Sequence, residues 1–176
     1  MSNKVETGTD DLLADLTDGV LTLTMNRPEA RNAMSNAMTG ALAQQLADAE
    51  LNSAVKVIVL TGAGKGFCAG GDVKGMAASG DGTVGDNTID GAIHRQRLNQ
   101  RGTAGALYSI PKPTIAALPG AAAGAGLSLA LACDMRIMAS SAMMTTAFAK
   151  VGFSGDYGGT FFMSQLIGTA KARELY

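Results

Sequence analysis

Short apolar runs separated by polar and glycine-rich stretches make up most of this chain. Residues 12–16 and 20–24 are two such runs around Asp18-Gly19, a dipeptide that favours a tight turn between antiparallel strands. Residues 55–60 and 114–118 combine β-branched and small apolar side chains, which is typical of strands buried within a sheet. We therefore expect an opening hairpin and two further buried strands.

Helical periodicity is found in two segments. Between residues 35 and 50, apolar side chains recur every three or four positions, and Ser35 or Asn36 can cap the start of the predicted helix. Residues 127–132 continue as a helix of small and apolar side chains, and residues 135–138 return as a strand. Strands that alternate with helices in this way predict an α/β fold.

A polar stretch separates the two halves of this pattern. Residues 75–91 are rich in Gly, Ser, Asp and Thr, which predicts a mobile loop, and a polar helix is expected over residues 93–107. The chain has a single histidine, His94, which we expect at the surface of that helix.

Composition narrows the class of protein. The 176 residues are 47% hydrophobic with a net charge of −1, which predicts one compact domain over residues 1–176 and neither a nucleic-acid nor a membrane partner. The polar, acidic N-terminus has no features of a secretion signal, so we expect a cytoplasmic protein. Cys68 and Cys133 have no metal-ligand spacing, so no metal is expected and both are interpreted as small buried side chains.

Two glycine-rich segments carry the candidate chemistry. Residues Gly66–Asp72 and Gly120–Gly126 each follow a predicted strand, and their small side chains allow free backbone N–H groups to approach a ligand oxygen closely. Together, the two segments could form an oxyanion hole.

These segments and several other motifs resemble the crotonase (enoyl-CoA hydratase/isomerase) superfamily. The resemblance implies a spiral of repeated ββα units, a homotrimer or hexamer, and C-terminal helices that we expect to be missing from these 176 residues. The motifs that carry it, besides the two glycine segments, are Asn26-Arg27-Pro28-Glu29, Val57-Ile58-Val59-Leu60-Thr61-Gly62, Pro111-Lys112-Pro113-Thr114, Gly158-Gly159-Thr160 and Lys171-Ala172-Arg173-Glu174-Leu175.

The same resemblance implies an acyl-CoA thioester as substrate, in fatty acid metabolism, with coenzyme A carried by that substrate and no separate cofactor. The backbone N–H groups of Gly71 and Ala125 would bind the thioester oxygen. Arg31 and Lys74 would pair with coenzyme A phosphates, or are solvated surface charges. The remaining implied substrate contacts are Cys68, Ala69, Gly70, Gly124, Gly126 and Phe148, and residues 75–91 would border the acyl pocket or form a solvated loop.

The catalytic carboxylates depart from the hydratase pattern. Ser128 and Phe148 occupy the two positions at which hydratases of the family carry glutamates, so the two-glutamate hydration mechanism is not expected. Asp156 lies where isomerases and a dehalogenase of the family keep a carboxylate, and we take it as the candidate acid/base. The alternative is that Asp156 caps the helix predicted over residues 160–167.

Three functions follow from this interpretation. The first is double-bond isomerisation of an enoyl-CoA, in which Asp156 moves the proton and the oxyanion hole stabilises the enolate. The second is a hydratase (lyase), hydrolase or dehalogenase that uses Asp156 differently. The third is a non-catalytic subunit that binds acyl-CoA.

Overall fold

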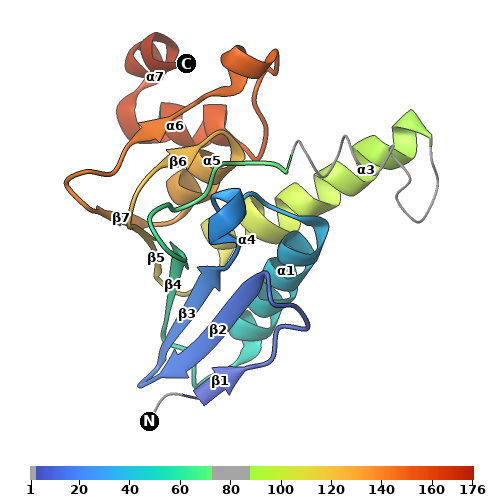
Figure 1. The fold of residues 1–176 in the computed structure, drawn as a ribbon, viewed down its shortest axis with the longest axis vertical. Coiled ribbons are helices and arrows are strands. Elements are labelled where there is room, and N and C mark those ends of the chain that lie inside the picture. Colours follow the sequence, from blue (N-terminus) through green and yellow to red (C-terminus); the bar gives the residue numbers. More distant parts are fainter. Residues whose placement is uncertain (1–2, 73–87) are drawn as a thin grey trace.

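A computed structural model describes residues 3–72 and 88–176, and within these ranges the protein has an α/β architecture. The strands of the larger sheet follow the order β1-β2-β3-β4-β5-β7 (Figure 1). A smaller sheet pairs β6 with β8. The described strands are β1 (Asn3–Val5), β2 (Leu12–Thr17), β3 (Val20–Met25), β4 (Val57–Gly62), β5 (Thr114–Leu118), β6 (Ala122–Ala123), β7 (Met135–Met138) and β8 (Met144–Thr145).

The opening hairpin is confirmed. Strands β2 and β3 pair antiparallel with Thr17 opposite Val20. Asp18 and Gly19 between them have φ values of 50° and 86°, the backbone that a tight two-residue hairpin turn requires. From β3 onward the sheet becomes parallel, with β3 beside β4, β4 beside β5, and β5 beside β7.

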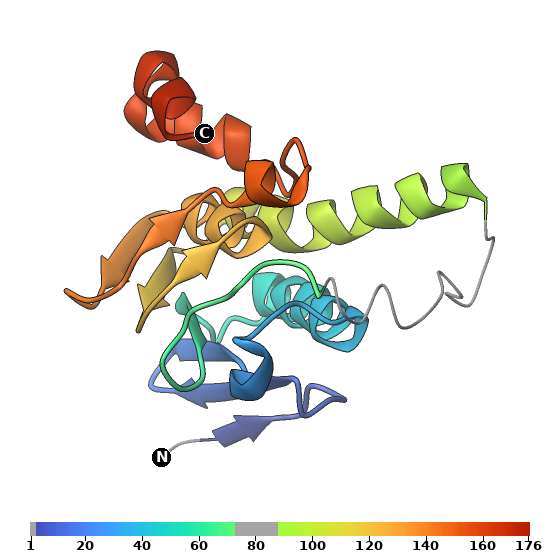
Figure 2. The ribbon, with the colours of Figure 1, turned by 45° about the horizontal axis from the view of Figure 1, so that its top comes forward.

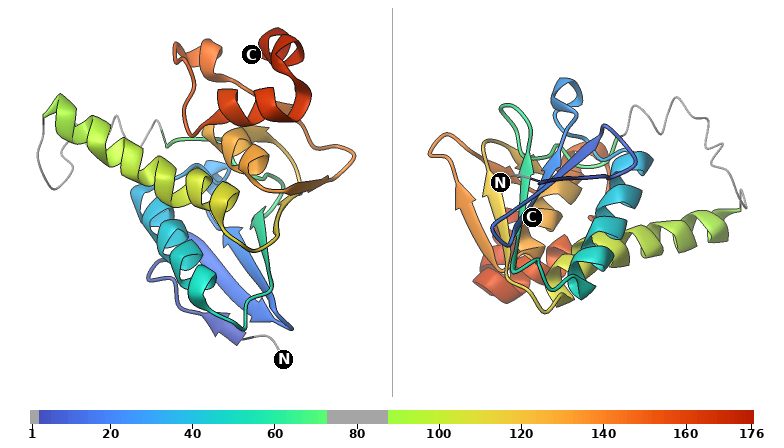
Figure 3. Two further views of the ribbon diagram at one scale, coloured as in Figure 1. Left: turned by 180° about the vertical axis from the view of Figure 1, so that it is seen from behind. Right: turned by 90° about the horizontal axis from the view of Figure 1, so that it is seen from below.

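Helices cover the sheet and extend beyond it. Helix α1 (Asn36–Leu51) contacts β2 and β3, and Figure 3 shows α1 and α3 (Ile89–Gln100) on the same side of the large sheet. Helix α3 projects outward from the body of the molecule, as Figure 2 shows. The other described helices and helical turns are η1 (Pro28–Ala30), α3 (Ile89–Gln100), the π-helical turn η2 (Arg101–Gly105), α4 (Ala106–Ser109), α5 (Ala125–Ala132), η3 (Phe148–Val151), α6 (Gly159–Ile167) and α7 (Thr169–Leu175).

Two predicted helices form with modified boundaries. Helix α1 is capped by Ser35, whose Oγ accepts a hydrogen bond of 3.0 Å from Met38 N. The polar helix begins at Ile89 instead of residue 93, because Thr88 caps it by accepting a bond from Gly91 N. The rest of the loop predicted over residues 75–91, and Lys74, lie outside the described residues.

The core lies between the parallel strands and the helices. Its largest fully buried side chains include Leu23, Leu42, Leu46, Leu60 and Phe67, contributed by β3, α1, β4 and the segment after β4. Apolar burial of this kind provides the main driving force for folding. Because β4 and β5 are adjacent and parallel, their carboxyl ends place both glycine segments at the same edge of the sheet.

Candidate active site

The two glycine segments lie side by side, as the sequence predicts. Phe67 N and Cys68 N donate to Ala121 O at 3.0 and 3.2 Å, and Ala123 N donates to Cys68 O at 2.9 Å. Cys68 and Ala122 also form an isolated parallel bridge. We call the two segments, residues 66–72 and 120–126, the glycine pair.

Glycine is required at two points of this contact. A Cβ on Gly126 would lie 2.4 Å from Cys68 O, closer than packed atoms approach, so the segments could not meet with a side chain there. Gly70 has φ +100°, and a Cβ on it would lie 3.0 Å from Ala123 O and 3.4 Å from Ala125 N. The backbone just before Gly71 therefore lies directly against the turn that begins α5.

Two backbone N–H groups are left without an acceptor in this arrangement. The neighbours of Gly71 are bonded, because Met34 N donates to Gly70 O and Asp72 N donates to Met34 O. Ala125 is the first residue of α5, whose first N–H groups have no intrahelical acceptor. Within residues 3–72 and 88–176, no hydrogen bond from Gly71 N or Ala125 N is found.

Polar side chains fix the first segment of the pair. Arg27 Nη1 donates to Asp72 Oδ2 and to Ala33 O, both at 2.8 Å, which holds the chain just after Gly71. Asn32 is fully buried, and its Nδ2 donates to Ala63 O and Gly66 O at 2.9 Å. The sequence alone gives no role to Asn32, since its acceptors lie more than thirty residues away in the chain.

Ser128 connects the glycine pair to the candidate acid. It lies one turn after Ala125 in α5 and is only 1% exposed. Its Oγ is 3.0 Å from Asp156 O and 3.4 Å from Gly124 O, and because a hydroxyl carries one proton, we assign it to the shorter contact. The residue at the expected glutamate position thus holds the backbone of Asp156.

Asp156 lies in the loop of residues 152–158, which we call the acid loop. Its Oδ2 accepts a hydrogen bond of 3.3 Å from Gln96 Nε2, and its backbone oxygen accepts from Gly159 N at 3.1 Å. Its Oδ1 is buried and has no hydrogen-bond partner in the described part of the chain. Burial raises the pKa of the Asp156 carboxyl, which makes its carboxylate a stronger base.

The helix-capping alternative for Asp156 is wrong. Helix α6 has Gly158 as its N-cap, and no side chain caps its start. The backbone oxygen of Asp156, not its carboxylate, accepts from Gly159 N.

Two aromatic rings lie near the acid loop. Phe148 is buried, and its ring stacks on that of Tyr176 with centroids 6.0 Å apart and an interplanar angle of 15°. The hydroxyl of Tyr176 is buried without a hydrogen-bond partner among the described residues. Burial and the charge of Asp156 raise the pKa of Tyr176, so its phenol stays protonated. Sequence reasoning missed Tyr176, because no motif or spacing relates it to Asp156.

The other residues singled out from the sequence differ in their exposure to solvent. Cys68 is buried, and burial raises the pKa of its thiol to about 12, so it is not a thiolate nucleophile at neutral pH. Ala69 is exposed, and its N–H donates to the backbone oxygen of Arg31 at 3.0 Å. Arg31 is exposed, Gly124 is buried beside the ring of Phe148, and Lys74 lies outside the described residues. His94 is exposed on α3, as predicted.

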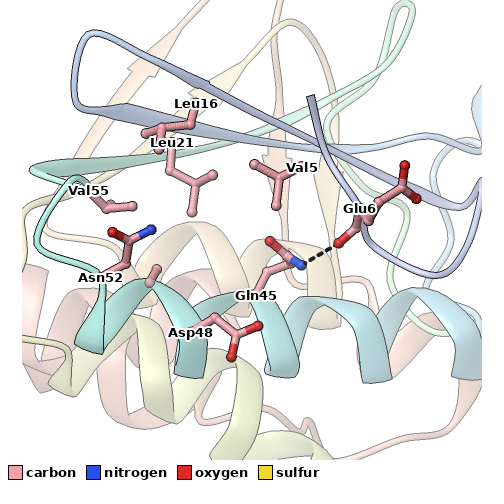
Figure 4. A pocket seen from close by; sticks show the side chains of 9 residues that line it. Val5, Glu6, Leu16, Leu21, Gln45, Asp48, Asn52 and Val55 are labelled. Atoms are coloured by element: carbon pink, nitrogen blue, oxygen red, sulfur yellow. Dashed lines mark hydrogen bonds between the residues drawn. The ribbon is translucent and has the colours of Figure 1, made fainter. Parts of the chain in front are cut away.

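A pocket of about 230 Å³ lies elsewhere, between α1 and the first strands (Figure 4). Gln45, on its floor, donates to the backbone oxygen of Glu6 at 3.0 Å. The pocket contains no residue of the glycine pair or the acid loop. The pocket is therefore separate from the candidate active site.

Residues 3–72 and 88–176 contain no group of three or more His, Cys, Asp or Glu side chains arranged to hold a metal ion. Of the helices that the structure describes, none has the length and apolar character needed to cross a membrane.

Comparison with known proteins identifies the family. Residues 15–176 match the model of the family described as enoyl-CoA hydratase/isomerase. Over 164 residues, the chain is 38% identical to 1,2-epoxyphenylacetyl-CoA isomerase of Escherichia coli, covering 93% of this chain and 61% of the relative. It is 39% identical over 164 residues to human enoyl-CoA hydratase domain-containing protein 2, mitochondrial, covering 93% of this chain and 53% of that protein.

Solved structures agree on the fold. The enoyl-CoA hydratase of Bacillus anthracis superposes with a TM-score of 0.82 at 33% identity, over 94% of this chain and 61% of that one. An enoyl-CoA hydratase from Polaromonas gives a TM-score of 0.82 at 34% identity, over 93% and 62% of the two chains. The chain therefore spans a little over half the length of the relatives it matches, and it has the crotonase-type fold and belongs to the enoyl-CoA hydratase/isomerase family.

Proposed function

We propose that this protein isomerises the double bond of an enoyl-CoA thioester, with Asp156 as the single proton carrier. The carboxylate of Asp156 removes a proton from the carbon next to the double bond, and the freed electron pair moves to the thioester oxygen. The carboxylic acid exchanges its proton with water, and the dienolate takes a proton from it at another carbon. Atoms and charge balance without a second acid or a cofactor.

The observation that carries this proposal is the state of Asp156. Its Oδ1 is buried and unpartnered within the described residues, and burial raises the pKa of its carboxyl. A raised pKa makes the carboxylate a stronger base, which favours its use as a proton carrier. Ser128 ties it to α5, one turn from Ala125.

The oxyanion would be bound by the N–H groups of Gly71 and Ala125. Both lack an acceptor within residues 3–72 and 88–176, and the turn before Ala125 packs against Gly70. Charge that develops on the thioester oxygen is stabilised best by donors that are already oriented. The N-terminus of α5 adds a positive partial charge at the same place.

The residues at the two expected glutamate positions favour isomerisation over hydration, whereas the sequence identities to relatives do not separate the two reactions. A relative named as an isomerase and one named as a probable hydratase match equally well, at 38% identity. In this chain Ser128 and Phe148 stand where we expect the hydratase glutamates, and neither side chain can act as a general base. The substrate would bring its own coenzyme A, with the exposed Arg31 as a candidate phosphate partner and the homotrimer as the expected assembly.

The test is mass spectrometry of 2-enoyl-, 3-enoyl- and aryl-CoA thioesters incubated with the protein in deuterated water. We expect a shifted double bond, with deuterium uptake and no added water. Added water or released coenzyme A would contradict isomerisation and support the hydratase or hydrolase alternative. A panel that binds but does not change would support the non-catalytic alternative.

A further inference from the structure

The two carboxylate oxygens of Asp156 are in different situations. Oδ2 lies 3.3 Å from Gln96 Nε2, which donates a hydrogen bond to it. Oδ1 is buried and has no partner within residues 3–72 and 88–176. The hydrogen bond occupies Oδ2, whereas no donor competes for Oδ1 within the described residues.

The backbone of Asp156 is already fixed. Its carbonyl oxygen accepts from Ser128 Oγ at 3.0 Å and from Gly159 N at 3.1 Å. The remaining freedom of the side chain is rotation about its own torsions. Within residues 3–72 and 88–176, Gln96 is the side chain that limits this rotation, through its bond to Oδ2.

The backbone of Gln96 is held as well. It is half-buried on α3, and at the end of that helix Thr103 and Ala104 of the π-helical turn η2 are buried. Thr103 Oγ1 donates to Asn99 O at 2.7 Å, and η2 contacts both α1 and α5. Helix α3 lies against the body of the molecule at its C-terminal end, and its other end projects outward (Figure 2). Gln96 is in the C-terminal half of this helix.

We propose that Gln96 is a positioning residue that holds Oδ2 of Asp156, so that Oδ1 is the oxygen that takes and returns the proton. The inference rests on the proposed function of Asp156 and names the residue that orients its carboxylate. A π-helical turn beside a functional side chain is a recurrent arrangement in proteins.

The hydrogen bond also affects proton affinity. A donor on Oδ2 stabilises the ionised carboxylate and opposes the effect of burial, so removal of the donor raises the pKa of Asp156 further. Helices α5 and α6 carry no titratable side chain. The other titratable groups on the surrounding elements are Tyr157 and Tyr176, Asp90, His94, Arg95 and Arg97 of α3, Lys150 of η3, and Lys171, Arg173 and Glu174 of α7.

The experiment measures the pKa of Asp156 by carbon-13 NMR of labelled aspartate carboxyls, with the signal assigned by its loss in Asp156→Asn. Gln96→Met keeps the length of the side chain and removes the donor. The matched control is Gln44→Met, because Gln44 Nε2 donates at 2.9 Å to Asp48 Oδ1 on the exposed face of α1. Thermal unfolding of each variant checks that the fold is intact.

We expect the pKa of Asp156 to rise in Gln96→Met and to stay unchanged in Gln44→Met. In Gln96→Glu it should rise further, because two adjacent carboxyls share one proton. Deuterium exchange into a 3-enoyl-CoA thioester should fall about tenfold in Gln96→Met, since a misaligned base loses orientation. A pKa of Asp156 that does not change in Gln96→Met overturns the inference about Gln96.

The two proposals fail separately. If Asp156→Asn keeps full exchange activity, the function proposed for Asp156 is wrong and the catalytic role of Gln96 falls with it. If Asp156→Asn is inactive while Gln96→Met has the pKa and exchange rate of the unmodified protein, only the inference about Gln96 is overturned.

Discussion

The glycine pair and the acid loop perform different tasks with different parts of the chain. In the glycine pair, the proposed donors are backbone N–H groups, held by bonds between main-chain atoms such as Ala123 N and Cys68 O. In the acid loop, the chemistry is assigned to one side chain, Asp156, held by Ser128 and Gln96. A site made of backbone N–H groups depends on the conformation of the chain, so it tolerates alanine at position 125. A site made of one side chain is altered by a single substitution of that residue.

Helix α5 joins these two regions, and its two ends are used differently. At the N-terminus, Ala125 N has no acceptor within the described residues. At the C-terminus, Arg136 Nη1 donates to Cys133 O at 2.6 Å and to Ala130 O at 3.3 Å. The carbonyl end is thus satisfied by the protein itself, which leaves the N-terminal end as the one available for a ligand.

Asp156→Asn should have the largest effect on the acid loop. An amide cannot take the proton, so turnover of an enoyl-CoA should fall about a thousandfold. Acyl-CoA affinity should change little, because the glycine pair is untouched. Steady-state kinetics and calorimetric titration measure the two quantities, with Asp90→Asn on exposed α3 as the control. Equal loss of binding and turnover would contradict the division between the two regions.

Gly126→Ala should damage the glycine pair. The new Cβ would lie 2.4 Å from Cys68 O, and forcing the two segments apart should cost about 2–3 kcal/mol of unfolding free energy. Chemical denaturation measures the loss. Gly40→Ala is the matched control, because a Cβ at Gly40 of α1 meets no atom within 4 Å and should stabilise the helix slightly. Equal stability of the two variants would show that the close contact does not exist.

Ser128→Ala should weaken the contact between helix α5 and the acid loop. The variant loses the bond to Asp156 O, which should cost about 1 kcal/mol, and the freed acid loop should lower turnover several-fold. Ser164→Ala is a fair comparison, since Ser164 Oγ donates to Thr160 O at 2.7 Å on an exposed helix face. If both variants retain full turnover, Ser128 does not position the acid.

The raised pKa of Asp156 predicts a pH dependence of stability. Because burial makes the folded carboxyl hold its proton more tightly than the unfolded one, stability falls as pH rises from the ordinary Asp value through the raised pKa. Asp156→Asn should therefore gain stability relative to the unmodified protein at pH 7. The gain should vanish near pH 4, where thermal unfolding of the two proteins should coincide. A gain that is independent of pH would exclude this titration as its cause.

His94→Ala should have the smallest effect. The side chain is exposed on α3, so stability should change by less than about 0.5 kcal/mol and turnover by less than twofold. Thermal unfolding and kinetics check both. A large loss of turnover would favour a mechanism that uses a histidine, such as the dehalogenase alternative.

The sequence predicted the elements that periodicity and turn chemistry determine. The hairpin around Asp18-Gly19, helix α1 behind Ser35 and strand β5 are confirmed with boundaries within two residues. The pairing of the glycine segments was also predictable, because each follows a buried strand. The π-helical turn η2 was not, since no local pattern distinguishes it from a continuing helix.

The surroundings of Asp156 were less predictable than its position. The family resemblance located the carboxylate, but Gln96 is sixty residues away on a polar helix, where a glutamine gives no signal. Nor does the sequence reveal that Ser128 bonds a backbone oxygen, because the acceptor is fixed by tertiary packing. The homotrimer, the cytoplasmic location and the single-domain boundary remain predictions.

The most direct test of the account is deuterium uptake by one 3-enoyl-CoA thioester in deuterated water, followed by mass spectrometry for the unmodified protein and for Asp156→Asn in parallel. The account predicts uptake with a moved double bond for the unmodified protein and neither change for Asp156→Asn. Uptake at the same rate by both proteins would contradict the assignment of Asp156 as the proton carrier.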